Sequence, residues 1–369
     1  MKPSLRIDLA AVRHNVTAWR RMVTGRPVWA VVKCDAYRMG LCEIARAALE
    51  AGVQRLCVID IAEARGLRER GITAPIVQIC ATPEQDLEAA VELDAIASLQ
   101  DVECAQVLSR AARAAGKTAL AHVAIDTGSG WSGVLSSASD RFAQAVAALP
   151  GITWEGAWTH ITGQQTMAAQ LERFRRAVRE LRTHGLEVPT LHVASTGPSL
   201  WGLEEGAVRI GVGLYGSAMR ETQWASEFRT ALEVRAPVFM VRRFEEAMPL
   251  GYGSTYVAQP GQTIVTLRIG YGEGLPKTLA GTGQALLRDQ LCPIVGNIGM
   301  NFTMLAAPPS ITPQQGDEAV LVGNIAALTL DEVAAAAQMI PHNVITMLGS
   351  GMRPNYANAA VGEAVGETA

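Results

Sequence analysis

The chain has 369 residues, 49% of them hydrophobic and 18% charged, which is enough apolar material for two ordinary domains. The formal net charge of −3 gives no basic excess for nucleic-acid binding, and no uncharged apolar run reaches the roughly 18 residues that a membrane span needs. The six cysteines form no C-x-x-C pair and no apolar leader follows Met1, so we expect no metal site and a cytoplasmic protein.

From about Pro27 to Tyr215, short apolar runs alternate with stretches rich in Ala, Arg and Glu that are typical of helices. Seven or eight such strand–helix units in about 200 residues predict a parallel sheet closed into a (β/α)8 TIM-like barrel. We expect this barrel domain over residues 1–230. The predicted strands cover residues 28–32, 56–59, 76–79, 95–97, 119–125, 154–158 and 190–194, and the predicted helices cover 41–51, 61–70, 83–91, 100–115 and 168–184.

The pattern changes after about Phe228, where Gly and Pro turns rather than helices separate the apolar runs. This change predicts a C-terminal, mostly β domain over residues 231–369, and an α/β fold class for the whole chain. The predicted strands of this domain cover residues 234–244, 263–269, 286–295, 304–306 and 318–322.

Polar residues mark the ends of several predicted barrel strands. Lys33 follows the run 28–32, Asp126-Thr127-Gly128 follows the run 119–125, and His160 and His192 stand in or just after later runs. The C-terminal ends of barrel strands build the active site in this fold, so we expect these residues to converge. A lysine in such a place can act as a nucleophile toward a carbonyl group.

The segment Lys33-Cys34-Asp35-Ala36-Tyr37, followed by Gly40, resembles the cofactor-lysine motif of the alanine racemase family, whose enzymes use pyridoxal 5′-phosphate (PLP). The resemblance implies a PLP-binding barrel followed by a β domain and a small amino-acid substrate. It also implies a head-to-tail homodimer with active sites shared between subunits. The resemblance continues in order at residues 125–128, His160, 192–196, 209–216, 252–256, 269–274 and 299–301.

A glycine-containing run after Arg209 is one candidate for holding the cofactor phosphate. Backbone N–H groups in such a run can approach an anion closely, although most Gly-x-Gly runs are plain turns. The resemblance implies that Gly211 and Val212 bind the PLP phosphate through this run. It implies further contacts from the hydroxyl groups of Thr196, where the family usually has Ser, and of Tyr37.

The resemblance also assigns the proton-transfer groups. Racemisation needs one base on each face of the α-carbon, and the family positions match Lys33 and Tyr252. His192 is expected between Tyr252 and Arg209, polarising the phenol through a hydrogen-bond chain. Arg209 is expected to face the pyridine nitrogen of PLP, which its donor-only guanidinium would keep unprotonated. His160 matches a histidine that faces the cofactor.

The chain departs from the family where the substrate carboxylate is bound. Trp131 replaces the arginine that contacts this carboxylate, and Ala124 replaces the lysine that supports that arginine. Met300 matches the family, but Asn301 replaces the aspartate that follows it; Met300 and Tyr271 match residues that reach the neighbouring subunit and line the substrate entrance. An indole offers one N–H donor and a large apolar face, so it cannot replace a bidentate arginine. We therefore predict altered carboxylate recognition and a substrate other than plain alanine, or a related reaction.

Three functions remain open on these grounds. The first is a two-base PLP-dependent racemase. The second is another PLP reaction at the α-carbon, such as retro-aldol cleavage, decarboxylation or group transfer, which the loss of the arginine favours and the presence of Tyr252 and His192 opposes. The third is a non-catalytic PLP-binding protein, which the predicted second domain disfavours.

Overall fold

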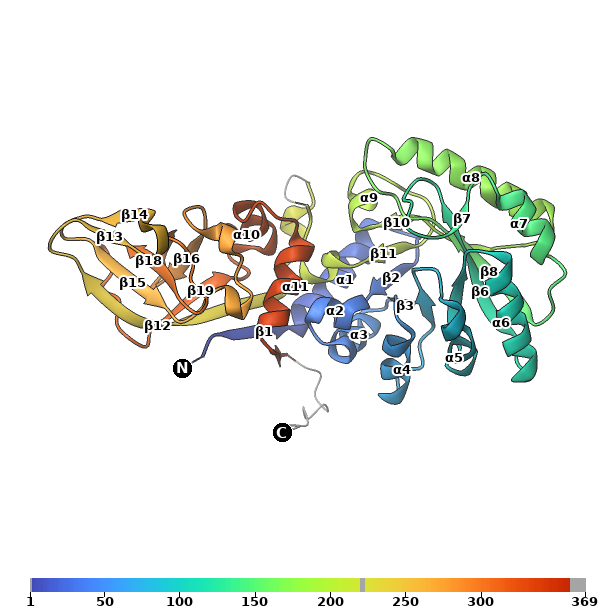
Figure 1. The fold of residues 1–369 in the computed structure, drawn as a ribbon, viewed down its shortest axis with the longest axis horizontal. Coiled ribbons are helices and arrows are strands. Elements are labelled where there is room, and N and C mark those ends of the chain that lie inside the picture. Colours follow the sequence, from blue (N-terminus) through green and yellow to red (C-terminus); the bar gives the residue numbers. More distant parts are fainter. Residues whose placement is uncertain (1, 220–222, 359–369) are drawn as a thin grey trace. The chain divides into compact units, whose positions relative to one another are not determined.

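The computed structural model describes residues 2–219 and 223–358, and the chain forms two compact units (Figure 1). The first unit comprises Val16–Ala36 and Leu41–Gly213. The second comprises Met1–Asn15, Tyr37–Gly40 and Leu214–Ala369. Residues 359–369 of the predicted second domain lie outside the described residues, and a simple division at residue 230 stays a prediction. No helix among the described residues is long and apolar enough to cross a membrane.

The first unit is built on a parallel sheet in the order β10-β11-β2-β3-β4-β5-β6-β8-β9, with the short β7 paired to β6. Only Val193 separates β9 from β10, so the two ends of the sheet meet at adjacent residues and the barrel nearly closes. The predicted TIM-like barrel is therefore confirmed. Its strands are β2 (Val28–Val31), β3 (Arg55–Val58), β4 (Ile76–Gln78), β5 (Ala95–Leu99), β6 (Ala119–Asp126), β7 (Val134–Leu135), β8 (Ile152–Trp158), β9 (Thr190–His192), β10 (Ala194–Ser195) and β11 (Val208–Ile210).

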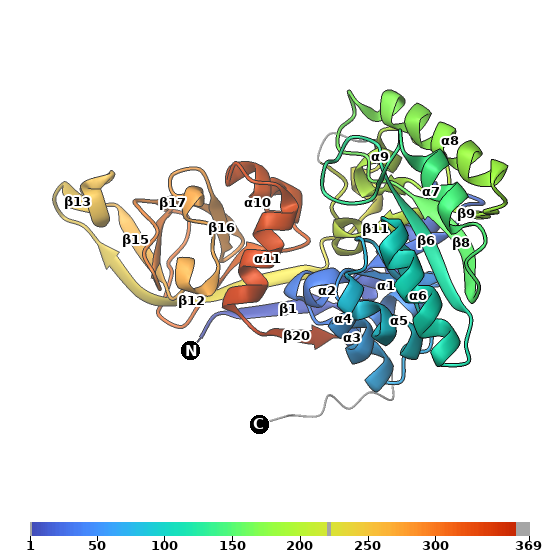
Figure 2. The same ribbon diagram turned by 45° about the vertical axis from the view of Figure 1, so that its right-hand side comes forward.

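Helices alternate with these strands, and α3 to α8 lie outside the sheet (Figure 2). Helix α6 shows why these segments are helical: Asp101 caps its first turn by accepting the N–H of Cys104 at 2.7 Å, and its apolar residues recur on one buried face. The helices are α1 (Leu9–Met22), α3 (Leu41–Glu50), α4 (Ile61–Glu69), α5 (Leu87–Glu92), α6 (Val102–Ala114), α7 (Ser139–Val146), α8 (Met167–Thr183) and α9 (Thr196–Leu200).

The second unit is rich in antiparallel strands, as predicted. Its main sheet runs β15-β18-β17-β16-β19-β12-β1-β20, and β12 also pairs with β15, so most of the sheet curls back on itself. The strands are β1 (Ser4–Asp8), β12 (Leu232–Arg243), β13 (Met248–Leu250), β14 (Tyr256–Ala258), β15 (Thr263–Leu267), β16 (Gln284–Leu287), β17 (Gln290–Val295), β18 (Thr303–Ala307), β19 (Glu318–Val322) and β20 (Pro354–Ala357), with helices α10 (Leu330–Ala336) and α11 (Pro341–Gly351).

Several strands differ from the sequence interpretation, and the short strands β7, β13, β14 and β20 were not predicted. β1 pairs with β12 and β20 in the second unit, although its residues lie within the range expected for the barrel. β11 was not predicted, because its three residues have the charged Arg209 at their centre and give no apolar run. The expected single strand 286–295 is wrong: it is a β16–β17 hairpin that turns at Arg288 and Asp289, which have φ of 47° and 59°. Two-residue hairpin turns of this kind usually contain glycine, so the sequence lacked the usual signal.

The turn that follows β2, α2 (Lys33–Arg38), is left-handed. Residues 34–38 all have φ between 49° and 68°. Such a conformation costs roughly 1–2 kcal/mol for each residue that is not glycine. The surrounding chain holds it in place: Asp35 donates its N–H to Glu63 Oε1 at 3.2 Å, and its Oδ1 accepts the N–H of Leu41 at 2.8 Å. Strain that is kept in this way clusters at functional sites.

The handedness of α2 predicts an inverted preference at Cys34, which is exposed and has a φ of 54°. In a right-handed helix alanine is more stable than glycine, but here Cys34→Gly should be more stable than Cys34→Ala by about 1 kcal/mol, because only glycine adopts positive φ without a steric cost. Both variants remove the thiol, so each is the matched control for the other. Urea unfolding measures the difference, and equal stability, or a more stable alanine variant, would contradict the left-handed turn.

Candidate active site

The C-terminal rim of the barrel gathers several of the predicted site residues. Lys33 is half-buried and lies two residues after the end of the fully buried β2. Arg209 lies on β11, which pairs with β2, and His192 ends β9. His160 follows the end of β8 by two residues. Because parallel strands end at a common rim, the first unit holds these four residues toward the same end of the barrel.

Arg209 is a buried cation, only 3% exposed, inside the barrel. Its Nη1 donates to His192 Nδ1 at 2.9 Å, its Nη2 donates to the carbonyl of Thr159 at 2.9 Å, and its guanidinium lies 5.6 Å from the ring centre of Trp158. Burial lowers the pKa of Arg209 to about 10. No carboxylate of the described residues pairs with it; Nη1 also donates to the carbonyl of His192, and none of the hydrogen bonds that Arg209 makes to the described residues uses Nε. A buried cation with unused donors is costly unless it has a task.

His192 is fully buried and has partners on both ring nitrogens. Its Nδ1 accepts from Arg209, and its Nε2 lies 2.8 Å from Nδ1 of His122. His122 Nε2 in turn bonds to Glu155, which also accepts from Arg55 Nη1 at 2.8 Å. The expected link from Arg209 to His192 is therefore present. Within the first unit the second ring nitrogen of His192 bonds to His122, and the expected link from His192 to Tyr252 stays a prediction.

The charges of this chain of groups follow from burial. Burial lowers the pKa of His192, which Arg209 lowers further, and burial also lowers the pKa of His122. Burial alone would raise the pKa of Glu155, but hydrogen bonds from His122 and Arg55 outweigh it and lower that pKa to about 2. Near neutral pH both histidines are thus neutral and Glu155 is ionised.

Sequence reasoning missed His122, Glu155 and Arg55. The available signal was a histidine and a carboxylate within strands predicted to face a barrel interior, which is normally filled with branched apolar side chains. Because each of these strands also presents residues outward, the pattern alone did not show which way the polar side chains point.

Trp131 stands on a loop that Asp126 organises. The Asp126 carboxylate accepts the backbone N–H groups of residues 128–130 at 2.8–3.2 Å; these bonds outweigh the effect of burial and lower its pKa. The indole is 78% exposed and stacks on His160, with ring centres 5.7 Å apart and planes inclined by 28°. Ala124 is buried and brings no charge to this rim. The barrel therefore presents an aromatic surface here.

The candidate phosphate site lies where β10 leads into α9. Thr196 begins α9, and its hydroxyl accepts the N–H of Gly211 at 3.3 Å. Val212, the next residue, is buried. Ser199 Oγ is buried without a hydrogen-bond partner among the described residues. Ser199 comes three residues after Thr196, so both side chains project from the same side of the helix. An unpartnered hydroxyl beside a threonine and a glycine N–H suits a group that accepts hydrogen bonds.

Two further predicted residues belong to the second unit. Tyr37 is buried, with its ring edge-on to Tyr215 at 5.8 Å and 5.9 Å from the ring of His342. Tyr252 stands on a tight turn that Asn297 fixes by donating to the Tyr252 carbonyl at 2.7 Å. The Tyr252 side chain is 79% exposed. The turn therefore fixes the backbone of Tyr252, and its exposed phenol can contact the surface of another protein chain.

Tyr271, Met300 and Asn301 lie together in the second unit. Tyr271 N–H donates to the carbonyl of Gly299 at 3.1 Å, which joins its turn to the segment that carries Met300. Tyr271 is 44% and Met300 is 58% exposed. Asn301 donates to Glu273 Oε1 at 2.7 Å. The asparagine is thus anchored to a carboxylate, which its aspartate counterpart could not approach without repulsion.

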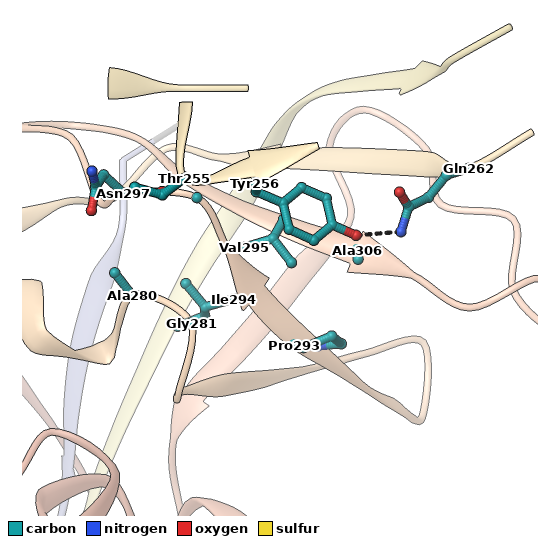
Figure 3. Close-up of a pocket in the computed structure, with 11 residues that line it drawn as sticks. Thr255, Tyr256, Gln262, Ala280, Gly281, Pro293, Ile294, Val295, Asn297 and Ala306 are labelled. Carbon is teal, nitrogen blue, oxygen red and sulfur yellow. Dashed lines mark hydrogen bonds between the residues drawn. The ribbon is translucent and has the colours of Figure 1, made fainter. Parts of the chain in front are cut away.

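A pocket of about 570 Å³ in the second unit lies apart from the predicted site residues (Figure 3). Its walls are mainly apolar, and the Tyr256 hydroxyl on its border accepts from Gln262 Nε2 at 2.5 Å. None of the predicted catalytic or cofactor-binding residues lines it. It adjoins the Tyr252 turn through Asn297.

Comparison with known proteins agrees with this arrangement. The family model described as "Alanine racemase, N-terminal domain" matches residues 7–219, and "Alanine racemase, C-terminal domain" matches residues 231–356. An alanine racemase of Desulfosudis oleivorans is 34% identical over 96% of each chain. One of Symbiobacterium thermophilum is 31% identical over 94% of each.

Two solved structures have the same fold as this chain. The alanine racemase from a D-cycloserine-producing Streptomyces lavendulae superposes with a TM-score of 0.90 and 28% identity over 97% of each chain. The structure from Bartonella henselae, which has covalently bound pyridoxal phosphate, shares the fold with a TM-score of 0.85 and 23% identity over 97% of this chain and all of that one. Both halves of the sequence and the whole fold therefore lead to one conclusion: this chain belongs to the alanine racemase family.

Proposed function

We propose that this protein is a PLP-dependent amino-acid racemase in which Lys33 and Tyr252 exchange the α-proton of the substrate. Membership of the alanine racemase family supports the class of enzyme and the cofactor. The observation that carries the proposal is the buried Arg209, which has unused donors and shares a barrel rim with Lys33. A cationic donor and an amine at one site suit a ring nitrogen and an aldehyde.

The residues of the first unit fit PLP chemically. Lys33 would hold the cofactor covalently, and Arg209 would donate to its ring nitrogen. Thr196, the Gly211 N–H and the Val212 backbone would receive the phosphate, near the unpartnered Ser199 hydroxyl. We assign to His160 and Tyr37 the supporting contacts that the family positions suggest. Arg209 would thus donate to the ring nitrogen at one end of the cofactor. The hydroxyl and backbone N–H groups would donate to the phosphate at the other end.

Bound PLP supplies the electron sink that makes the α-proton of an amino acid acidic. Lys33 Nζ would take or return this proton on one face. The Tyr252 hydroxyl would do the same on the other face. Arg209 stays protonated near neutral pH, so it would donate a hydrogen bond to the ring nitrogen and leave that nitrogen unprotonated, which would make the ring a weaker electron sink. Prompt return of the proton is thereby favoured over side reactions.

Tyr252 and Lys33 belong to different compact units, and Tyr252, Tyr271 and Met300 are all strongly exposed. Exposed aromatic and methionine side chains of this kind are typical of interfaces. We infer a head-to-tail homodimer in which the second unit of one subunit supplies Tyr252 to the barrel of the other.

Mixing two inactive variants tests this assignment. Lys33→Ala should lose both racemisation and the visible absorbance of bound cofactor, whereas Tyr252→Phe should lose racemisation only. If the subunits share sites, a re-equilibrated equal mixture of the two variants should recover about a quarter of wild-type activity, because half the dimers then carry one intact site.

Tyr256→Phe, which removes a phenol at the border of the pocket in Figure 3, is the control and should stay active. Absence of recovery in a mixture shown to contain heterodimers would place both bases on one chain. Full racemisation by Tyr252→Phe would remove Tyr252 from the mechanism.

The rim around Trp131 supports altered substrate recognition. Neither Trp131 nor Ala124 brings a cation to this rim, and Asn301 is neutral. The proposed substrate is therefore an amino acid that does not depend on an arginine at this position to bind its carboxylate, and plain alanine should be a poor one.

Restoring the family residues should improve alanine as a substrate. The double variant Ala124→Lys/Trp131→Arg should raise kcat/KM for alanine by about tenfold to a hundredfold, the range expected for a hydrogen bond to a charged group. Trp131→Phe keeps the aromatic face and should give no such gain. Wild-type kinetics on alanine equal to those of the double variant would contradict altered recognition.

The same substitutions keep a second candidate open, namely another PLP reaction at the α-carbon. Incubation with L- and D-amino acids in deuterium oxide separates the two. A racemase should exchange the α-hydrogen and invert chirality with no other product. Cleaved or decarboxylated products without inversion would establish the second candidate.

A further inference from the structure

A continuous line of polar groups crosses the interior of the barrel. It runs from Arg209 through His192 and His122 to Glu155 and Arg55. Arg209 lies 2.9 Å from His192, and His192 lies 2.8 Å from His122. His122 bonds to Glu155, which accepts from Arg55 at 2.8 Å. Arg55 begins β3 and so lies toward the N-terminal rim, opposite the rim of Lys33. The side chains of Arg55 and Glu155 are 19% and 18% exposed, whereas both histidines are fully buried.

Two tryptophans shield this line from water. Trp29 lies 4.6 Å from the His192 ring and 4.9 Å beneath the Arg55 guanidinium. Trp158 stacks on His192 at 5.9 Å, lies under Arg209, and is itself fixed by donating to Ser98 Oγ at 2.8 Å. In such surroundings a misdirected hydrogen bond is costly, because water cannot replace the lost partner.

The chemistry of the two ends fixes every proton between them. The ionised Glu155 can only accept, so His122 must carry its proton on Nε2. Neutral His122 then presents a lone pair on Nδ1, which accepts from a protonated Nε2 of His192. His192 is left with a lone pair on Nδ1, and Arg209, which can only donate, bonds to it. The opposite tautomer of either histidine would set two donors face to face.

We propose that His122 and Glu155 are positioning residues, which hold His192 in the one tautomer that can accept from Arg209 and so aim the remaining guanidinium N–H groups at the cofactor site. The inference deepens the proposed function, on which it rests for the role of Arg209. It also explains why a barrel interior carries a costly polar line where aliphatic side chains would pack.

Glu155→Gln tests the proposal. The Glu155 carboxylate accepts from three side chains, His122, Arg55 and Thr190, whereas the glutamine has a single amide oxygen, so either His122 or Arg55 faces its NH2 group. The ¹⁵N imidazole signals of the cofactor-free protein report the tautomers directly. Wild-type His122 and His192 should both be protonated on Nε2 only, and Glu155→Gln should shift either histidine toward the Nδ1-protonated form or a mixture. The second substitution in Glu155→Gln/Arg55→Gln supplies an acceptor for the NH2 group and should restore the wild-type tautomers.

The cofactor gives a second readout. Glu155→Gln should weaken PLP binding by about tenfold or more and lower kcat with little change in KM, because Arg209 meets the cofactor rather than the substrate. The matched control is Glu205→Gln, which removes a carboxylate from the Arg175–Glu205 pair outside the line and should change neither readout.

An Nδ1-protonated His192 in the wild type would overturn the proposal, and this measurement needs no variant to fold. Unchanged imidazole signals in Glu155→Gln would also overturn it, as would altered tautomers with unchanged PLP affinity. Failure of the wild type to bind PLP would instead refute the proposed function, while the tautomer measurement would still stand.

Discussion

The structure of the first unit depends on one buried cation. Arg209 sits inside the barrel with no carboxylate partner among the described residues, and its positive charge is met by two carbonyl groups, an imidazole lone pair and the face of Trp158. Each partner must offer electron density and none may offer a proton. Because Arg209 needs an acceptor on His192, His192 must donate to His122, and His122 must donate to the Glu155 carboxylate. The polar interior of the barrel therefore follows from the demands of a single side chain.

The turn that begins at Lys33 has an unfavourable backbone conformation. Residues 34–38 adopt the left-handed conformation, and Glu63 and Asp35 secure the turn by hydrogen bonds. Strain in this segment and burial of Arg209 are both unfavourable to folding taken alone. The strained turn follows β2, and Arg209 lies on the neighbouring strand β11, so both occur toward one rim of the barrel. A fold that accepts two such costs side by side does so where it performs chemistry.

Much of this could be predicted from the sequence, for identifiable reasons. The alternation of buried strands and amphipathic helices predicted the barrel, and the polar residues at strand ends predicted where Lys33, His160 and His192 lie. The left-handed turn was not predicted, because none of residues 34–38 is a glycine. Arg209 was predicted as a partner of His192, but His122 was not, because this pairing depends on which way two strands of the barrel point their side chains. The β16–β17 turn was not predicted, because neither Arg288 nor Asp289 is a glycine.

The proposed function requires that the cofactor be joined to Lys33, at the rim occupied by Arg209. The chain has only four lysines, Lys2, Lys33, Lys117 and Lys277, so borohydride reduction of the PLP-loaded protein followed by peptide mass mapping gives an unambiguous answer. We expect the mass of reduced pyridoxyl phosphate on the peptide that contains Lys33 and on no other. Label on a different lysine, or no label after reduction of the yellow protein, would contradict it.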